Sequence, residues 1–115
     1  MSWSKRCSYL LLAFLLWFPV YGTLASDVCP SKQGTSLRFV DVFDGAPEDL
    51  ATLVPDQAGK YSGYWQLGYV YDAGRYVTVR CKYANGQTLD VKLSDKVSKC
   101  SYTIDSKKTL ALRCK

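Results

Sequence analysis

The side chains able to do chemistry in this sequence are mainly carboxylates, cysteines and tyrosines, because the chain contains no histidine. Without histidine, the usual serine–histidine and cysteine–histidine nucleophilic mechanisms are excluded. The sequence also lacks an HExxH motif, a P-loop and a GxGxxG fingerprint. The carboxylates that remain as candidates for paired-acid catalysis are Asp41, Asp44, Glu48, Asp49 and Asp72.

Four of these five carboxylates also have an explanation that needs no catalysis. Asp44 suits a turn, Glu48 and Asp49 suit the first turn of a helix, and Asp72 suits a loop. A small domain with no second domain to form a cleft also makes a poor glycosidase. We therefore predict a protein that is not an enzyme, with no catalytic residues and no cofactor. The lack of histidine and of any CxxC pair predicts no metal site.

The first 26 residues have the layout of a secretory signal peptide, in which a short basic start precedes an apolar run and small residues. The apolar run, Leu10 to Val20, is shorter than the roughly 20 residues that a membrane span needs. We expect cleavage after Ala25 or Ser26 rather than a retained anchor. The product is then a single domain over residues 27–115, exported to the periplasm, with no stable membrane anchor and no nucleic-acid partner.

Four cysteines remain after this cleavage: Cys29, Cys81, Cys100 and Cys114. An even number of cysteines in a small exported domain is typical of a disulfide framework. Three pairings are possible. We favour Cys81–Cys100, which would join neighbouring strands, and Cys29–Cys114, which would join the two ends of the domain.

Residues 75–93 carry the clearest pattern of secondary structure. Apolar and polar side chains alternate on both sides of Asn85-Gly86, with the period of a β-strand. Asparagine and glycine both tolerate the positive φ of a type I′ turn, so this stretch predicts an antiparallel hairpin.

Shorter runs of the same kind lie before and after this hairpin. The six expected strands cover residues 36–43, 61–67, 75–84, 87–93, 98–104 and 109–114. Irregular alternation in the first of them indicates a bulge or burial on both faces. A short helix is expected over residues 47–54, because Pro47 suits a first helical position and Pro55 ends the pattern. The fold class is therefore mainly β: a small antiparallel meander that approaches a barrel or a sandwich, stapled by disulfides.

The charges are distributed unevenly along the chain, whose net charge is +5. Residues 27–74 contain 7 acids and 3 bases, whereas residues 75–115 contain 3 acids and 10 bases. A basic face for an acidic protein or an anionic envelope polymer is one interpretation. The other is that these lysines lie in solvent on the outer faces and edges of strands.

The aromatic residues of the middle segment are the most unusual feature: Tyr61, Tyr64, Trp65, Tyr69, Tyr71, Tyr76 and Tyr83. Large amphipathic rings suit binding interfaces and also stack on sugars. The alternative is that alternate rings fill the core. We predict Trp65 in the core. The predicted partner-binding residues are Tyr64, Tyr69 and Tyr71, with Asp72 and Arg75 beside them as polar partners.

A set of motifs gives the sequence a resemblance to a known group of proteins. These motifs are Cys29-Pro30, the segment Val42–Asp56 (VFDGAPEDLATLVPD), the tryptophan strand, VRCKY at Val79–Tyr83 and SKCSYT around Cys100. Together they resemble a family of small exported proteins of enterobacteria, encoded near type VI secretion clusters. The resemblance implies a periplasmic immunity protein against a cell-wall-degrading effector, and it implies no catalytic residues.

A second resemblance covers fewer residues. Ser62-Gly63-Tyr64 is similar to the loop with which periplasmic inhibitors of C-type lysozyme enter the enzyme's cleft. The function that we expect is therefore an immunity or inhibitor protein that blocks the active site of a peptidoglycan-targeting enzyme, most simply a cognate type VI effector. The alternatives are a glycan- or envelope-binding module and a structural accessory protein.

Overall fold

The alternating segment at the centre of the sequence folds into the predicted hairpin. β6 (Val77–Tyr83) pairs antiparallel with β7 (Thr88–Leu93). On β6 the four apolar positions of the pattern are buried, whereas Arg80 and Lys82 remain partly exposed. The strand therefore presents one face to the core and the other outward, as period two requires, and Thr78 on the outward face is also buried.

The turn of this hairpin differs from the predicted type I′ geometry. Asn85 does not adopt a positive φ, and only Gly86 does, at 89°. The Tyr83 N–H donates to the Gln87 carbonyl at 2.9 Å, and the Gly86 N–H donates to the Tyr83 carbonyl at 3.0 Å. This is the three-residue loop in which a glycine takes the left-handed position.

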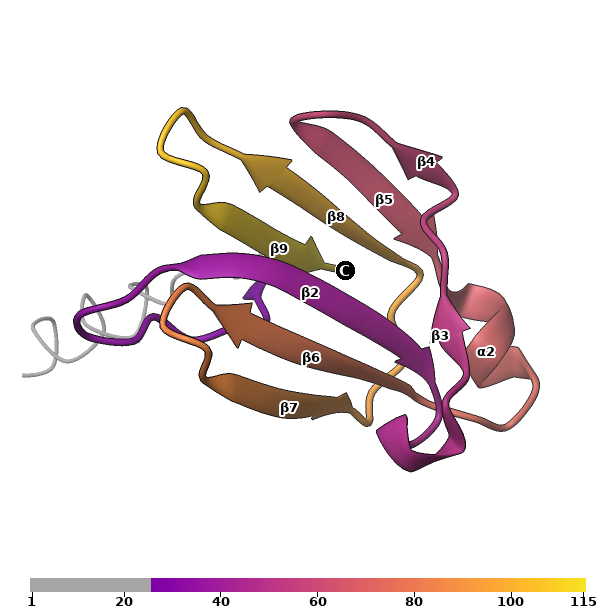
Figure 1. Ribbon diagram of the computed structural model, residues 1–115. Coiled ribbons are helices and arrows are strands. Elements are labelled where there is room, and N and C mark those ends of the chain that lie inside the picture. Colours follow the sequence, from indigo (N-terminus) through magenta and orange to yellow (C-terminus); the bar gives the residue numbers. More distant parts are fainter. Residues whose placement is uncertain (1–25) are drawn as a thin grey trace, which may run out of the picture.

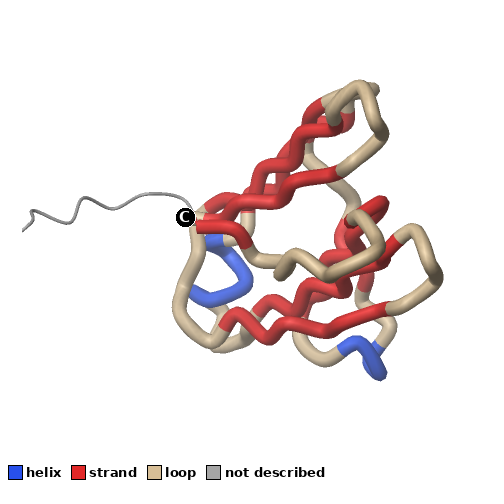
Figure 2. Tube along the Cα trace, turned by 90° about the vertical axis from the view of Figure 1, so that its left-hand side faces the viewer, coloured by secondary structure: helices blue, strands red, loops and turns tan. Residues whose placement is uncertain are grey.

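The computed structural model describes residues 26–115, which form two antiparallel sheets packed face to face (Figure 1). The four-stranded sheet has the order β3-β2-β6-β7, and the five-stranded sheet has the order β1-β9-β8-β5-β4. Figure 2 shows these two layers one above the other. The remaining strands are β1 (Ser26–Asp27), β2 (Leu37–Asp44), β3 (Thr52–Leu53), β4 (Gln57–Ala58), β5 (Ser62–Gln66), β8 (Lys99–Ile104) and β9 (Leu110–Cys114).

The mainly β fold class is confirmed, in its sandwich form rather than as a closed barrel. The six predicted strands correspond to the strands of five residues or more, namely β2, β5, β6, β7, β8 and β9. The three two-residue strands were not predicted. The predicted irregularity of the first strand is a bulge between Leu37 and Phe39. The signal peptide predicted for residues 1–26 lies outside the described residues except for Ser26.

The core lies between the two sheets and takes side chains from both. Val42 and Val79 come from the four-stranded sheet, and Trp65 and Leu112 come from the five-stranded sheet. Val70 closes one end of the core from helix α2 (Gly68–Asp72). Trp65 is thus a core residue, as predicted. Within residues 26–115 no helix is long and apolar enough to cross a membrane.

The helix predicted over residues 47–54 forms only in its first turn. Residues 47–54 contain a single 3₁₀ turn, Pro47–Asp49, which ends at Leu50, and β3 follows. The predicted apolar stripe does not pack on a sheet, because Leu50 and Val54 are 81% and 83% exposed. An α-helix forms at α2, between two of the predicted strands, where no helix was predicted, and Leu67 and Val70 are both buried there.

The favoured disulfide pairing, Cys81–Cys100 with Cys29–Cys114, is wrong. Cys29 is bonded to Cys81, and Cys100 is bonded to Cys114. Cys81 and Cys100 belong to different sheets, so they are not on neighbouring strands. Cys100 and Cys114 face each other in the register of β8 and β9, and Cys29 ties the N-terminal segment to β6.

Candidate partner-binding surfaces

Helix α2 and the turn that follows it bring four of the five predicted contact residues to one end of the sandwich. We call Tyr69, Tyr71, Asp72 and Arg75 the α2 surface. Because Val70 is buried in the core, the preceding residue, Tyr69, points outward and is 55% exposed, and Asp72 is also exposed. The helix lies at one end of the two sheets (Figure 1).

Tyr71 has a positioning role as well as a place on this surface. Its side chain is half-buried, and its hydroxyl donates a hydrogen bond to the Leu93 carbonyl at 2.7 Å. Burial raises the pKa of the Tyr71 phenol, so this hydroxyl stays protonated and continues to donate. Tyr71 therefore ties α2 to the end of β7.

Both charged residues of the α2 surface are engaged in ion pairs. The Asp72 carboxylate lies 2.7 Å from the Lys96 Nζ. The Arg75 guanidinium makes two hydrogen bonds to Asp44, of 2.7 and 2.9 Å. The side-chain hydrogen bond to Asp44 raises the pKa of Arg75. A planar two-point pair of this kind fixes both side chains, so Arg75 joins the α2 surface to the end of β2.

Tyr64, the fifth predicted contact residue, belongs to a different surface. It lies on β5 between two inward positions, Gly63 and Trp65, and therefore points to the outer face of the five-stranded sheet. The Lys99 Nζ lies 4.2 Å from the centre of its ring, which is a cation–π contact. The structure thus does not place Tyr64 on the α2 surface.

The uneven charge along the sequence is partly compensated in the fold. Of the five ion pairs within residues 26–115, four join an acid of residues 27–74 to a base of residues 75–115. These four are Arg75–Asp44, Lys82–Asp41, Lys96–Asp72 and Arg113–Asp27. The reason is topological, since β2 pairs with β6 and β1 pairs with β9. The uneven distribution therefore reflects in part complementary partners within the chain, while Lys92, Lys99, Lys107, Lys108 and Lys115 make none of these ion pairs.

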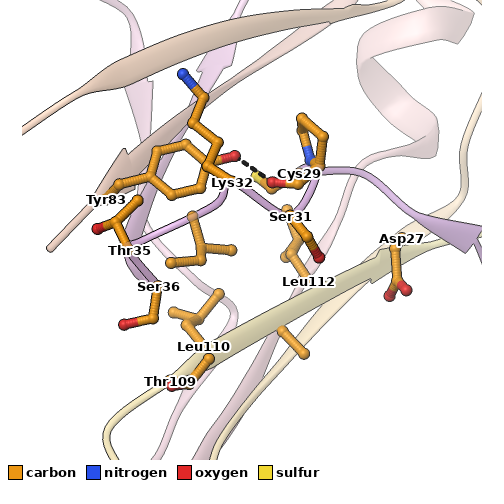
Figure 3. Close-up of a pocket in the computed structure, with 13 residues that line it drawn as sticks. Asp27, Cys29, Ser31, Lys32, Thr35, Ser36, Tyr83, Thr109, Leu110 and Leu112 are labelled. Atoms are coloured by element: carbon orange, nitrogen blue, oxygen red, sulfur yellow. Dashed lines mark hydrogen bonds between the residues drawn. The ribbon is translucent and has the colours of Figure 1, made fainter.

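A cleft of about 290 Å³ lies between the N-terminal segment and β9 (Figure 3). It is lined by Asp27, Cys29, Pro30, Ser31, Lys32, Thr35, Ser36, Leu37, Tyr83, Thr109, Leu110, Ala111 and Leu112. Its acidic side chain, Asp27, is paired with Arg113, and the Tyr83 hydroxyl donates to the Pro30 carbonyl. The lining thus combines hydroxyl groups with one carboxylate and one lysine, Asp27 and Lys32.

An apolar groove of about 340 Å³ opens between the two sheets beside β3. Phe39, which is 65% exposed, and Val54 stand at its mouth, and Trp65 and Tyr102 form part of its lining. Within residues 26–115, no cluster of histidine, cysteine or acidic residues suits a metal ion.

The loop between β2 and β3 is a feature that the sequence reasoning missed. Residues 45–51, which we call the β2–β3 loop, carry Leu50 outward with a φ of 57°. The signal was hidden because leucine in a PEDLATL segment is typical of an apolar helical stripe. A leucine with positive φ cannot be recognised from its neighbours in the sequence.

In a comparison with protein-family models, the family described as "Type VI secretion system Tli immunity protein" matches residues 31–115. No curated protein and no solved structure matches the chain.

Proposed function

This chain belongs to the type VI secretion system Tli immunity protein family, and we propose that it binds its cognate effector in the periplasm and covers the effector's active site. The family match carries this proposal. Two disulfides within a domain of this size support the oxidising compartment, because such bonds persist in the periplasm and are rare in the cytosol. In this proposal the protein acts by binding and carries no catalytic residues.

The α2 surface is the proposed contact area. Tyr69 offers a large ring with little conformational entropy to lose, and Asp72 lies beside it. Tyr71 and Arg75 hold this area rigid through their bonds to Leu93 and Asp44. Rigid presentation favours tight binding because little ordering remains to be done on association. Tyr64 provides a separate contact on the outer face of the five-stranded sheet.

For the effector we propose an enzyme that attacks the cell envelope, with peptidoglycan as the first substrate to be tested. The proposed periplasmic location supports this choice. The expected likeness of Ser62-Gly63-Tyr64 to the lysozyme-inhibitor loop does not, because these residues lie in strand β5, which pairs with β4 and β8. An enzyme whose substrate enters an open cleft can be inhibited by a protein that fills or covers the cleft.

The experiment is titration of the purified chain, with its disulfides intact, against the purified effector encoded beside its gene. Calorimetry measures binding, and release of product from peptidoglycan sacculi and from phospholipid vesicles measures inhibition. We expect a 1:1 complex and loss of activity at equimolar ratio. Binding without inhibition would contradict the covering of the active site, and activity on vesicles alone would exclude the peptidoglycan target.

Absence of binding to the effector would contradict the proposal as a whole. A pull-down with sacculi in the absence of effector tests the alternative of a glycan-binding module. Salt-sensitive retention on sacculi, together with no effector binding, would favour that alternative, because contact with an anionic polymer weakens as salt screens it.

A further inference from the structure

The β2–β3 loop is held in a single shape by backbone hydrogen bonds. The Asp44 N–H donates to the Ala51 carbonyl at 2.9 Å and closes the base of the loop. Inside it, the Leu50 N–H donates to the Pro47 carbonyl at 3.1 Å. The Gly45 N–H donates to the Tyr76 carbonyl at 2.7 Å and attaches the loop to the four-stranded sheet. The loop projects from the body as the unlabelled magenta turn after β2 (Figure 1).

Leu50 at the end of this turn combines two unfavourable properties. Its φ of 57° lies in the left-handed region, which is disfavoured for a side chain with a Cβ and is better tolerated by glycine or asparagine. Its side chain is 81% exposed, so the leucine does not contribute to the core. Folding alone therefore gives no reason for leucine here. Strained backbone positions cluster at functional sites, and the exposed apolar side chain distinguishes Leu50 from a strained turn residue such as Lys108.

The charges next to Leu50 indicate what it would meet. Glu48 and Asp49 are both exposed, and neither makes an ion pair with any residue of the described chain. Asp44, the residue directly before this loop, is paired with Arg75, which belongs to the α2 surface. The loop and the α2 surface are therefore neighbours. An apolar side chain flanked by two carboxylates complements an apolar pocket with a basic rim.

We propose that Leu50 inserts into an apolar pocket with a basic rim on the effector, and that the β2–β3 loop and the α2 surface form one continuous interface. This inference rests on the proposed function, because it presumes that the effector is the partner. The loop is preorganised, so the leucine enters the pocket with little loss of backbone entropy.

The test uses Leu50→Asn, which removes the apolar side chain and suits the left-handed backbone. We expect affinity for the purified effector to fall about 10- to 100-fold, the value of burying one leucine side chain. The midpoint of urea unfolding should stay the same or rise, because strain is relieved. A lower affinity together with an unchanged or higher unfolding midpoint would exclude misfolding as the cause of the weaker binding.

Lys108→Asn is the matched control. Lys108 has a φ of 63°, and its N–H donates to the carbonyl three residues earlier, as that of Leu50 does. It lies in the turn between β8 and β9 and carries no apolar side chain. This variant should show the same change in stability with no change in affinity.

Glu48→Gln combined with Asp49→Asn tests the basic rim, and should slow association at low salt and flatten its salt dependence. Wild-type affinity in Leu50→Asn, with the wild-type chain binding the effector, would overturn this inference and leave the proposed function intact. Failure of the wild-type chain to bind the effector would overturn both.

Discussion

At the scale of single residues, Gly63 shows how tightly the five-stranded sheet is packed. A Cβ at this position would lie within 3 Å of the Gln57 carbonyl oxygen and of the Tyr102 ring. We predict that Gly63→Ala lowers the free energy of unfolding by about 1–3 kcal/mol, the usual effect of overpacking. Urea denaturation measures this change.

Gly68→Ala is the control for that variant. A Cβ at Gly68 would meet only the Lys96 Cε, at the ordinary contact distance of 3.9 Å, and Gly68 begins α2. This variant should leave the stability unchanged or raise it slightly, since alanine favours a helix over glycine. Equal losses in both variants would contradict the close packing at Gly63.

Asp90 gives a prediction about pH. Its carboxylate accepts two hydrogen bonds from the Arg80 guanidinium, at 2.8 and 3.0 Å, and the side-chain hydrogen bond lowers the pKa of Asp90. A pKa that is lower in the folded chain than in the unfolded chain stabilises the fold above the unfolded value. This contribution is lost as the pH falls through the folded value.

Asp90→Asn should therefore be less stable than the wild type at pH 7, and the difference should shrink as the pH drops below about 4. The difference is small because the pair is partly exposed to solvent. Urea midpoints across this pH range measure it, and Arg80→Gln should show the same convergence. A difference in stability between variant and wild type that stays constant with pH would contradict the stabilising role of the ionised Asp90 carboxylate.

At the scale of elements, the two disulfides constrain different parts of the chain. Cys29–Cys81 closes a sequence separation of 52 residues and holds the N-terminal segment on β6, whereas Cys100–Cys114 closes 14 residues between strands that already pair. In the chain-entropy account the longer loop contributes about 4 kcal/mol and the shorter about 3 kcal/mol. Cys29→Ser/Cys81→Ser should therefore lose more stability than Cys100→Ser/Cys114→Ser.

Non-reducing peptide mapping checks the connectivity on which this prediction depends. Peptides that contain Cys29 and Cys81 should be linked, and so should those that contain Cys100 and Cys114. Urea denaturation of the two double variants then ranks their contributions. A larger loss from the β8–β9 bond would show that native packing, rather than loop closure, sets the contribution.

At the scale of the whole molecule, the interface should lie on one end of the sandwich. Tyr69→Ala combined with Asp72→Ala should weaken effector binding by about tenfold or more, as expected for residues near an interface centre. The unfolding curve should change little, because both side chains are exposed. Calorimetry against the purified effector measures the affinity.

Tyr64→Ala reports separately on the outer face of the five-stranded sheet, since Tyr64 does not belong to the α2 surface. Loss of affinity in Tyr64→Ala alone would move the interface to that face. Loss in both variants would show that the effector wraps around β5. Unchanged affinity in both would contradict the contact area that we propose.

The sequence by itself determined the features that depend on near neighbours. Alternation over residues 75–93 predicted the hairpin, and shorter runs with the same period predicted the other four of the six longer strands. The pattern is local because successive side chains on a strand face opposite sides of the sheet. The alternation around Trp65 and the size of its ring were enough to predict its burial. The four cysteine positions predicted two disulfides, but not their pairing.

Only the tertiary structure decided the features that depend on which strands meet. The Cys29–Cys81 bond follows from where the N-terminal segment crosses β6, and the ion pair between Arg75 and Asp44 follows from where α2 meets the end of β2. In the sequence Leu50 belongs to an apolar pattern typical of a helix, whereas in the structure its side chain points outward and its φ is positive. These outcomes are non-local, because each depends on contacts between segments that are distant in the sequence, and periodicity describes only local faces.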